Sequence, residues 1–211
     1  MILHGYWRSG ASYRVRIALN LKGLGYDLAA HDLRKGAQKA ADYVALNPQG
    51  MVPALQVGDD VLIQSPAILE WLEETYPEPP LLPGTAADRA HVRAMAAVVG
   101  CDIHPLNNLR VLGALRKDFD ADQAAIDAWA ARWIASGFDA LEALVARDGG
   151  DFCFGDAPTL ADCYLIPQLY SARRFNVDTT AWRSLTAIET HALAQSAFAA
   201  AHPDRQPDAD A

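Results

Sequence analysis

A cluster of prolines divides the sequence into two parts with different patterns: Pro77, Pro79, Pro80 and Pro83. Each proline fixes φ and has no backbone N–H to donate, so the cluster predicts a stiff connector rather than a helix or an inner strand. Before it, strand and helix patterns alternate, and after it only helical patterns remain. The sequence therefore predicts an α+β protein with a first domain at residues 1–80 and an all-helical domain at residues 86–211.

The first part has the periodicities of a small mixed sheet with helices. Gly58, Asp59 and Asp60 separate two short apolar runs and are typical of a hairpin turn. Ser65 is the predicted N-cap of the helix that follows, with Pro66 at its first position. The predicted elements, in βαβαββα order, are strands at residues 2–6, 26–33, 52–57 and 61–64 and helices at residues 15–21, 38–45 and 65–76.

The second part contains long, alanine-rich helical segments at residues 86–115, 122–146, 159–174 and 186–201. Pro105 is expected to kink or divide the first of them, because it removes a backbone donor inside a helix. Thr159 and Asp162 form a variant of the capping box at the start of the third segment. The last residues, 204–211, are predicted to be a disordered tail.

The composition narrows the class of protein. A net charge of −8 argues against a general nucleic-acid or acidic-membrane surface, which needs a positive field. No apolar stretch approaches the length of about 20 residues that crosses a bilayer, and the start of the chain lacks the pattern of a signal peptide. The three cysteines are widely spaced, which fits a reducing compartment, and the histidines have no metal-binding spacing. We therefore expect a soluble, cytoplasmic protein without a metal ion.

The start of the chain predicts an anion-binding corner. A short strand at residues 2–6 runs into a polar turn at residues 8–12, and a helical pattern follows at once. A helix start offers unpaired N–H groups and a partial positive charge, and either Ser9 or Ser12 can cap it. Thioredoxin-type redox proteins carry Cys-x-x-Cys at such a corner, whereas this chain has no cysteine before Cys101. Thiol chemistry here would therefore need a sulfur from a ligand.

Several motifs resemble the zeta class of glutathione transferases over essentially the whole chain. They are WRSGASYRVRIAL at residues 7–19, ALNP at 45–48, VP at 52–53, QSPAI at 64–68, DAPTLAD at 156–162, RRF at 173–175 and RQPD at 205–208. Within the class, GCDIHPLNN at residues 100–108 with Arg110 looks most like the bacterial maleylpyruvate isomerases. The resemblance implies a thioredoxin-like domain joined to an α-helical domain, a homodimer, and glutathione as cofactor.

The resemblance also implies roles for individual residues. Ser9 would hydrogen-bond the glutathione sulfur and help to hold it as a thiolate. The cations that would hold the substrate carboxylate and the developing enolate are Arg8, Arg110 and Arg174. The residues that would bind glutathione are Gln64 and Ser65 at the γ-glutamyl end, Val52 at the cysteinyl part, Pro53 as the cis proline there, Gln38 at the glycyl end, and His104 and Asn108 on the helical side.

The activity that the resemblance implies is cis–trans isomerisation of maleylpyruvate to fumarylpyruvate. The glutathione thiolate would add to the double bond of the cis enone, rotation would follow, and elimination would return the thiol unchanged. Most zeta enzymes have Ser-Ser-Cys where this chain has Ser9, Gly10 and Ala11. Maleylpyruvate isomerases also tend to lack that cysteine. Its absence therefore leaves isomerisation as the expected activity and argues only against side activities that depend on the thiol.

Simpler roles remain open for several of these residues. Ser9 could be only a helix cap. Arg173 could face the site in place of Arg174. The residues that could instead be capping, packing, surface or ion-pair residues are His104, Asn108, Arg110 and Arg174.

Other functions also remain open. The nearest is isomerisation of maleylacetoacetate, and a more distant one is conjugation of glutathione to electrophiles or dehalogenation of small haloacids. A different class is a non-catalytic module that binds a partner protein.

Overall fold

The computed structural model describes residues 1–210 and divides the chain into two compact units. The first unit holds Met1–Leu81 together with the segment that begins at Ala194, and the second unit is Leu82–Leu193. The sequence predicts that all of residues 86–211 belong to the helical domain. The C-terminal segment lies instead in the first unit, because α9 (Ser196–Ala201) packs against α1 (Gly10–Leu21).

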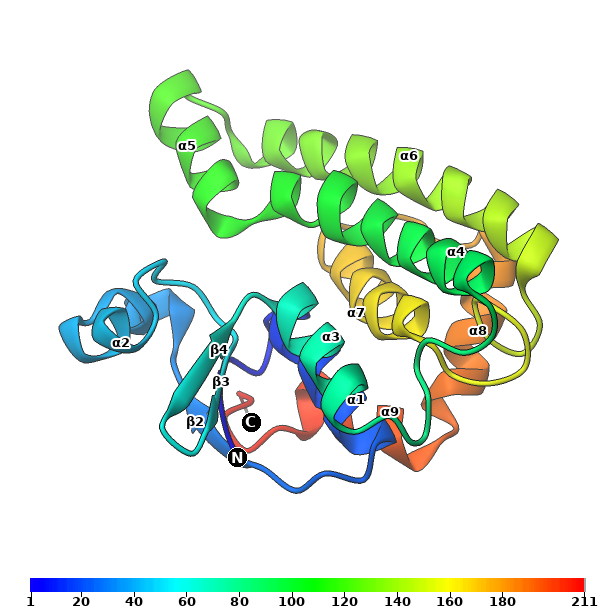
Figure 1. Ribbon diagram of the computed structural model, residues 1–211. Helices are drawn as coiled ribbons and strands as arrows, with labels where there is room; N and C mark the ends of the chain where they lie inside the picture. Colours follow the sequence, from blue (N-terminus) through cyan, green and yellow to red (C-terminus); the bar gives the residue numbers. More distant parts are fainter. Residues whose placement is uncertain (211) are drawn as a thin grey trace. The chain divides into compact units, whose positions relative to one another are not determined.

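The first unit is built on a four-stranded sheet with the strand order β2-β1-β3-β4 (Figure 1). β1 pairs with β2 in parallel and with β3 in antiparallel, and β3 pairs with β4 as a hairpin. The predicted βαβαββα order is confirmed. The elements are β1 (Ile2–Gly5), α1, β2 (Asp27–Ala30), η1 (Leu33–Lys35), η2 (Ala37–Lys39), α2 (Ala41–Leu46), β3 (Ala54–Val57), β4 (Asp60–Ile63), α3 (Ser65–Thr75), α9 and η5 (Pro203–Arg205).

Side chains alternate along β1 between two layers of helices. Leu3 is fully buried and shares its face with Gly5, where an added Cβ would lie 3.3 Å from Ser12 Oγ of α1. His4 points to the opposite face, and its ring lies 6.1 Å from the ring of Tyr43 in α2. The helices α1 and α2 therefore cover opposite faces of the sheet (Figure 1).

Two predicted elements of this unit differ in length. The strand expected at residues 26–33 is shorter, because Asp32 accepts the Arg34 N–H (3.0 Å) and starts the 3-10 turn η1. The helix expected at residues 38–45 is divided into η2 and α2, because Ala40 has extended backbone angles.

The C-terminal end of α1 carries a buried ion pair. The Lys22 side chain is fully buried, and its Nζ donates to Glu73 Oε2 of α3 at 2.8 Å. The same Nζ donates to the carbonyl oxygens of Tyr76 (2.6 Å) and Pro79 (3.0 Å). Glu73 Oε2 also accepts from the Leu81 N–H (3.0 Å). One ammonium group and one carboxylate thus fasten the proline-rich connector to the ends of α1 and α3.

A histidine pair on the α2 face of the sheet couples stability to pH. His4 Nδ1 and His31 Nε2 lie 3.1 Å apart. Burial lowers the pKa of His31 below its usual value of 6.5, the His4 ring lowers it further, and Asp42 opposes the change. Just below pH 6.5 the unfolded chain therefore binds more protons than the folded chain, so the contribution of neutral His31 is complete above that pH and is lost as the pH falls through its lowered pKa.

We accordingly expect the urea midpoint of unfolding to fall as the pH is lowered below about 6.5. The fall should be smaller in His31→Gln, which has no proton to bind at this position. Tryptophan fluorescence would measure the urea midpoints. An equal fall in the wild-type protein and in His31→Gln would show that protonation of His31 is not the cause.

The second unit is built of helices, as predicted, and Pro105 does divide the first predicted segment. The capping box is also confirmed, since Asp162 Oδ2 accepts the Thr159 N–H at 2.8 Å. α4 packs against α7, and α6 packs against α8 and against the π-helical turn η3. The elements are α4 (Ala86–Ala97), η3 (Val98–Ile103), η4 (Pro105–Asn107), α5 (Leu109–Phe119), α6 (Gln123–Asp148), α7 (Leu160–Arg174) and α8 (Arg183–Leu193).

A close approach between α6 and η3 depends on Gly137. A Cβ added to Gly137 would lie 2.5 Å from Cγ1 of Ile103, a fully buried side chain that has little room to move. We expect Gly137→Ala to lower the free energy of unfolding by about 1–3 kcal/mol through overpacking, measured by denaturant unfolding. Gly113→Ala is the matched control, because a Cβ there meets nothing within 4 Å.

The predicted disordered tail is wrong for residues 204–210. Pro203–Arg205 forms η5, and the Asp208 carboxylate accepts a hydrogen bond from the Trp7 N–H (2.9 Å). Ala211 lies outside the described residues. No helix within residues 1–210 is long and apolar enough to span a membrane.

Candidate active site

The loop between β1 and α1 places Ser9 at the start of a helix. Ser9 is the N-cap of α1, and its Oγ accepts the Ser12 N–H at 3.2 Å. Ser12 is fully buried, and its own Oγ accepts the Tyr6 N–H at 3.4 Å. Of the two predicted alternatives, Ser9 is therefore the cap. Since a hydroxyl both accepts and donates, the Ser9 O–H is left to donate beside a helix N-terminus, where negative charge is favoured.

Arg8 lies next to Ser9 in the same loop. Its guanidinium carbon is 5.4 Å from the centroid of the Trp7 ring, a cation–π distance, and its side chain is half-buried. The Ser9 N–H donates to the Tyr6 carbonyl oxygen (3.0 Å) and closes a turn around Trp7 and Arg8. The loop thus carries one cation and one hydroxyl side by side in sequence.

The segment before β3 presents free main-chain groups. The peptide bond between Val52 and Pro53 is cis, as the resemblance implied. The preceding Met51 carbonyl is held by Asn47 Nδ2 (2.7 Å) and by the Tyr43 hydroxyl (2.7 Å). Within residues 1–210 the Val52 N–H and C=O form no hydrogen bond. Such a half-buried, unpaired main chain can pair with the backbone of an extended ligand.

The start of α3 differs from the prediction. Ser65 is the first residue of the helix and not its N-cap, because Gln64 takes a positive φ of 68° and occupies the cap position. Ser65 is buried, and its Oγ accepts from Arg14 Nη1 at 3.4 Å. Gln64 Nε2 donates to Gln49 Oε1 (2.5 Å). The helix N-terminus and the buried Arg14 together favour an anion at this position.

Arg14 is a residue that the sequence did not single out. It lies in the middle of α1 and is only 3% exposed. The signal that could have marked it is its place between Tyr13 and Val15, at the start of an apolar stretch that runs to Leu19, because buried arginines are rare without partners.

Gln38 has an unsatisfied acceptor. Its Oε1 is buried and has no hydrogen-bond partner within residues 1–210. A buried amide oxygen without a donor carries a free-energy cost, which a ligand N–H can remove.

The second unit holds the remaining predicted site residues. His104 closes η3 with its N–H on the Val99 carbonyl oxygen (2.9 Å). Asn108 caps α5 by accepting the Arg110 N–H at Oδ1 (3.2 Å). Asn107, by contrast, has both side-chain amide atoms buried and without a partner in the described chain. Asn107 is therefore the better candidate for a ligand contact than Asn108.

The two arginines at the end of α7 differ in their partners. Arg173 Nη1 donates to Glu189 Oε1 of α8 (2.6 Å), and Nη2 bonds the second carboxylate oxygen. This fork-to-fork pair occupies Arg173 within the unit. Arg174, the last residue of α7, and Arg110, on the first turn of α5, are both exposed.

The predicted site residues fall into two sets. The first unit contains Arg8, Ser9, Gln38, Val52, Pro53, Gln64 and Ser65, and the second contains His104, Asn108, Arg110 and Arg174. Among the described residues no group of three or more His, Cys, Asp or Glu is arranged to hold a metal ion. All three cysteines lie in the second unit, so the corner at Ser9 has no thiol of its own.

Two domain families match the chain. The N-terminal domain of glutathione S-transferase matches residues 8–75, and the C-terminal domain matches residues 123–203. A maleylpyruvate isomerase of Ralstonia sp. is 57% identical over 210 residues, which are 99% of each chain.

Solved structures of glutathione S-transferases also match the chain. The holo structure of a maleylpyruvate isomerase, a bacterial glutathione S-transferase of the zeta class, has a TM-score of 0.98 and 56% identity over 100% of both chains. A maleylacetoacetate isomerase from Methylobacterium extorquens AM1, with bound malonate and glutathione, has a TM-score of 0.96 and 42% identity, again over 100% of both chains. Through both matched domains and its full-length similarity to a zeta-class enzyme, the chain belongs to the glutathione S-transferase family.

Proposed function

We propose that this chain is a glutathione-dependent cis–trans isomerase that converts maleylpyruvate to fumarylpyruvate. The observation that carries the proposal is the 57% identity to the maleylpyruvate isomerase of Ralstonia sp. across 99% of both chains. Glutathione is the proposed cofactor, since the related structure from Methylobacterium extorquens AM1 holds it.

The first unit fits a tripeptide thiol. The buried Gln38 Oε1 lacks a donor, and the Val52 main chain lacks partners within residues 1–210. The N-terminus of α3 with Ser65 and the buried Arg14 suits a carboxylate. The unpaired groups match an extended peptide backbone with a charged end.

The chain's own residues have separable proposed tasks. The bound cofactor supplies a thiolate that adds reversibly to the double bond of a cis enone and so permits rotation about it. Ser9 donates its O–H to the sulfur, and the N-terminus of α1 adds a partial positive charge. The proposed cations for the substrate carboxylates and for the negative charge that develops on the ketone oxygen are Arg8, Arg110 and Arg174.

The remaining residues bind and orient the cofactor in this proposal. Gln64 and Ser65 take its γ-glutamyl end, Val52 pairs with its cysteinyl backbone beside Pro53, and Gln38 meets its glycyl end. On the helical unit the proposed contacts are His104 and Asn108. Asn107 is a third proposed contact, because its side-chain amide is buried and has no partner within residues 1–210.

Maleylacetoacetate is the second candidate substrate. The specific observation in its favour is the TM-score of 0.96 to a maleylacetoacetate isomerase. Maleylpyruvate ranks first because the identity to a maleylpyruvate isomerase structure is higher, 56% against 42%.

Steady-state turnover of the two substrates tests the proposal. We expect a higher kcat/KM for maleylpyruvate, complete dependence on added glutathione, and no loss of glutathione over many turnovers. An equal or inverted substrate preference would overturn the first choice. Stoichiometric consumption of glutathione would indicate conjugation instead, and failure to bind glutathione would favour a non-catalytic module.

We further propose that the protein is a homodimer and acts in the cytoplasm. Three free cysteines, two of them buried, support a reducing compartment. Sedimentation equilibrium and cell fractionation test these two statements.

A further inference from the structure

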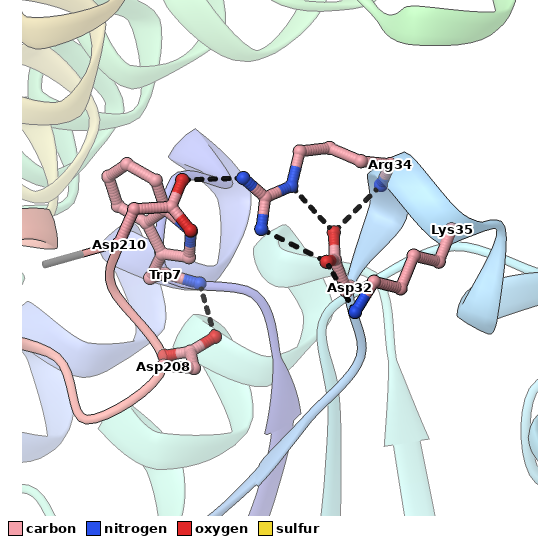
Figure 2. Close-up of polar contacts among 6 residues, drawn as sticks. All are labelled: Trp7, Asp32, Arg34, Lys35, Asp208 and Asp210. Atoms are coloured by element: carbon pink, nitrogen blue, oxygen red, sulfur yellow. Dashed lines mark hydrogen bonds and ion pairs between the residues drawn. The ribbon is translucent and has the colours of Figure 1, made fainter.

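The end of the chain returns to the loop that carries Arg8 and Ser9. Beyond α9 and η5, the Asp208 carboxylate accepts the Trp7 N–H at Oδ2 (2.9 Å), across 201 residues of sequence. Figure 2 shows this contact, with the C-terminal segment running beside the loop. The other carboxylate oxygen, Oδ1, is buried and has no partner within residues 1–210.

The segment that leads to Asp208 is itself fixed. Gln206 Nε2 donates to the carbonyl oxygens of Ala200 and His202, both at 2.9 Å. The Gln206 N–H donates to the Pro203 carbonyl oxygen (3.0 Å). The Asp208 carboxylate therefore lies on a segment that is held by hydrogen bonds two residues earlier, at Gln206.

The opposite end of the Trp7 residue is held by a second group. Arg16 of α1 is fully buried; its Nη2 donates to the Trp7 carbonyl oxygen (3.0 Å), and its Nε donates to the Ala201 carbonyl oxygen (2.9 Å). The N–H of Trp7 is thus held by Asp208 and its C=O by Arg16. Both of these partners depend on the C-terminal segment, because Ala201 orients the Arg16 guanidinium.

Trp7 occupies a position from which small movements reach Ser9. The hydrogen bond from the Ser9 N–H to the Tyr6 carbonyl oxygen closes a four-residue turn. Trp7 and Arg8 are the two central residues of this turn. Rotation of the Trp7 peptide would move Arg8 and the hydroxyl of Ser9 together. Positioning of reacting groups is sensitive at this scale, since a misplacement of about 1 Å costs about 100-fold in rate.

A neighbouring ion pair adds a weaker anchor. Arg34 bonds both Asp32 and Asp210, and all three lie at the surface (Figure 2). Exposed pairs of this kind are screened by salt and contribute little. Asp208 is therefore the dominant contact of the tail, and Asp210 serves as its internal control.

We propose that Asp208 is a positioning residue, which acts through the Trp7 peptide to place Ser9 against the thiol of glutathione. This inference rests on the proposed function. It extends the functional part of the protein to a C-terminal segment that makes no proposed contact with cofactor or substrate.

The test compares Asp208→Ala with Asp208→Asn. Alanine removes the acceptor for the Trp7 N–H, whereas the asparagine carbonyl oxygen can replace it without the charge. For alanine we expect kcat to fall by about 10- to 100-fold and the pKa of the bound thiol, followed by ultraviolet absorbance of the thiolate, to rise by about one unit. The Kd of glutathione should change by less than about threefold, because its other contacts remain. Asparagine should retain most of the activity and the thiol pKa.

Controls separate positioning from folding and from the proposed function. Asp210→Ala, which breaks only the exposed pair, should leave kcat and the thiol pKa unchanged. A purely structural role would lower Tm in Asp208→Ala without moving the thiol pKa, and that result would overturn the inference. If Asp208→Ala does not fold, Asp208→Glu, which displaces the Trp7 peptide by one methylene, must show the same changes at smaller size; wild-type values would overturn the inference.

Two further outcomes distinguish failure of this inference from failure of the proposed function. If the unsubstituted protein binds glutathione and isomerises its substrate while Asp208→Ala matches it, the inference alone fails. If the unsubstituted protein does not bind glutathione, the proposed function fails and the inference falls with it.

Discussion

Replacing Lys22 with methionine is expected to lower the free energy of unfolding by about 3–5 kcal/mol. The fully buried ammonium is the partner of Glu73 and of the Tyr76 and Pro79 carbonyl oxygens. Removal of the cation leaves a buried carboxylate without its counter-charge, and a methionine of similar length cannot hydrogen-bond the two carbonyls. Urea unfolding with a constant m-value would measure the loss.

A double variant distinguishes lost charge from lost packing. Lys22→Met combined with Glu73→Leu should recover part of the loss, because an apolar pair no longer buries an unpaired charge. Recovery should be incomplete, since Glu73 also accepts the Leu81 N–H. Lys35→Met is the matched control, with a side chain 83% exposed, and should change stability by less than about 0.5 kcal/mol. A loss below about 1 kcal/mol in Lys22→Met would show that the pair contributes no more than a surface ion pair.

Ser9→Ala is expected to lower kcat/KM for the isomerisation by about 100- to 1,000-fold, the usual effect of removing one donor to a developing or stabilised anion. The Ser9 Oγ accepts the Ser12 N–H and keeps its own hydrogen for a ligand. Because most of the cofactor contacts lie elsewhere, the Kd of glutathione should change much less than the rate. Stopped-flow and steady-state assays at several values of pH would measure both.

A second substitution separates the two roles of this serine. Glycine is nearly as good as serine at an N-cap, whereas alanine is poor, so helix capping alone would leave Ser9→Gly close to normal. If the hydroxyl serves the sulfur, Ser9→Gly and Ser9→Ala should lose similar activity, and Ser9→Thr should retain much of it. Normal activity in Ser9→Gly would reduce Ser9 to a helix cap.

Local patterns predicted the features that depend on neighbouring residues. The prolines from Pro77 to Pro83, the hairpin around Gly58 and the capping box at Thr159 all follow from short-range rules, and the structure has each of them. The sequence also predicts that either Ser9 or Ser12 caps the first helix, and the structure shows that the cap is Ser9.

Features that depend on distant parts of the chain were not predictable in this way. The Ser65-Pro66 pattern predicts Ser65 as the N-cap, and nothing in the sequence indicates the positive φ of 68° that places Gln64 there instead. Arg14 and Arg16 are buried because α3 and α9 both pack against α1, which erases the one-sided periodicity of a surface helix. Asp208 accepts a hydrogen bond from Trp7 across 201 residues, whereas composition alone predicts that its segment is disordered.

The return of the C-terminal segment makes the first unit discontinuous, and this has a consequence for synthesis on the ribosome. Leu82–Leu193 is contiguous in sequence, whereas the Arg16 side chain and the Trp7 N–H obtain their partners Ala201 and Asp208 only when the end of the chain has been made. Until then the Arg16 guanidinium lacks one of the carbonyl acceptors for its buried charge. A fragment that stops at Leu81, or a nascent chain stalled before its last residues, should therefore hold an incompletely ordered first loop and be a preferred target for chaperones and proteases.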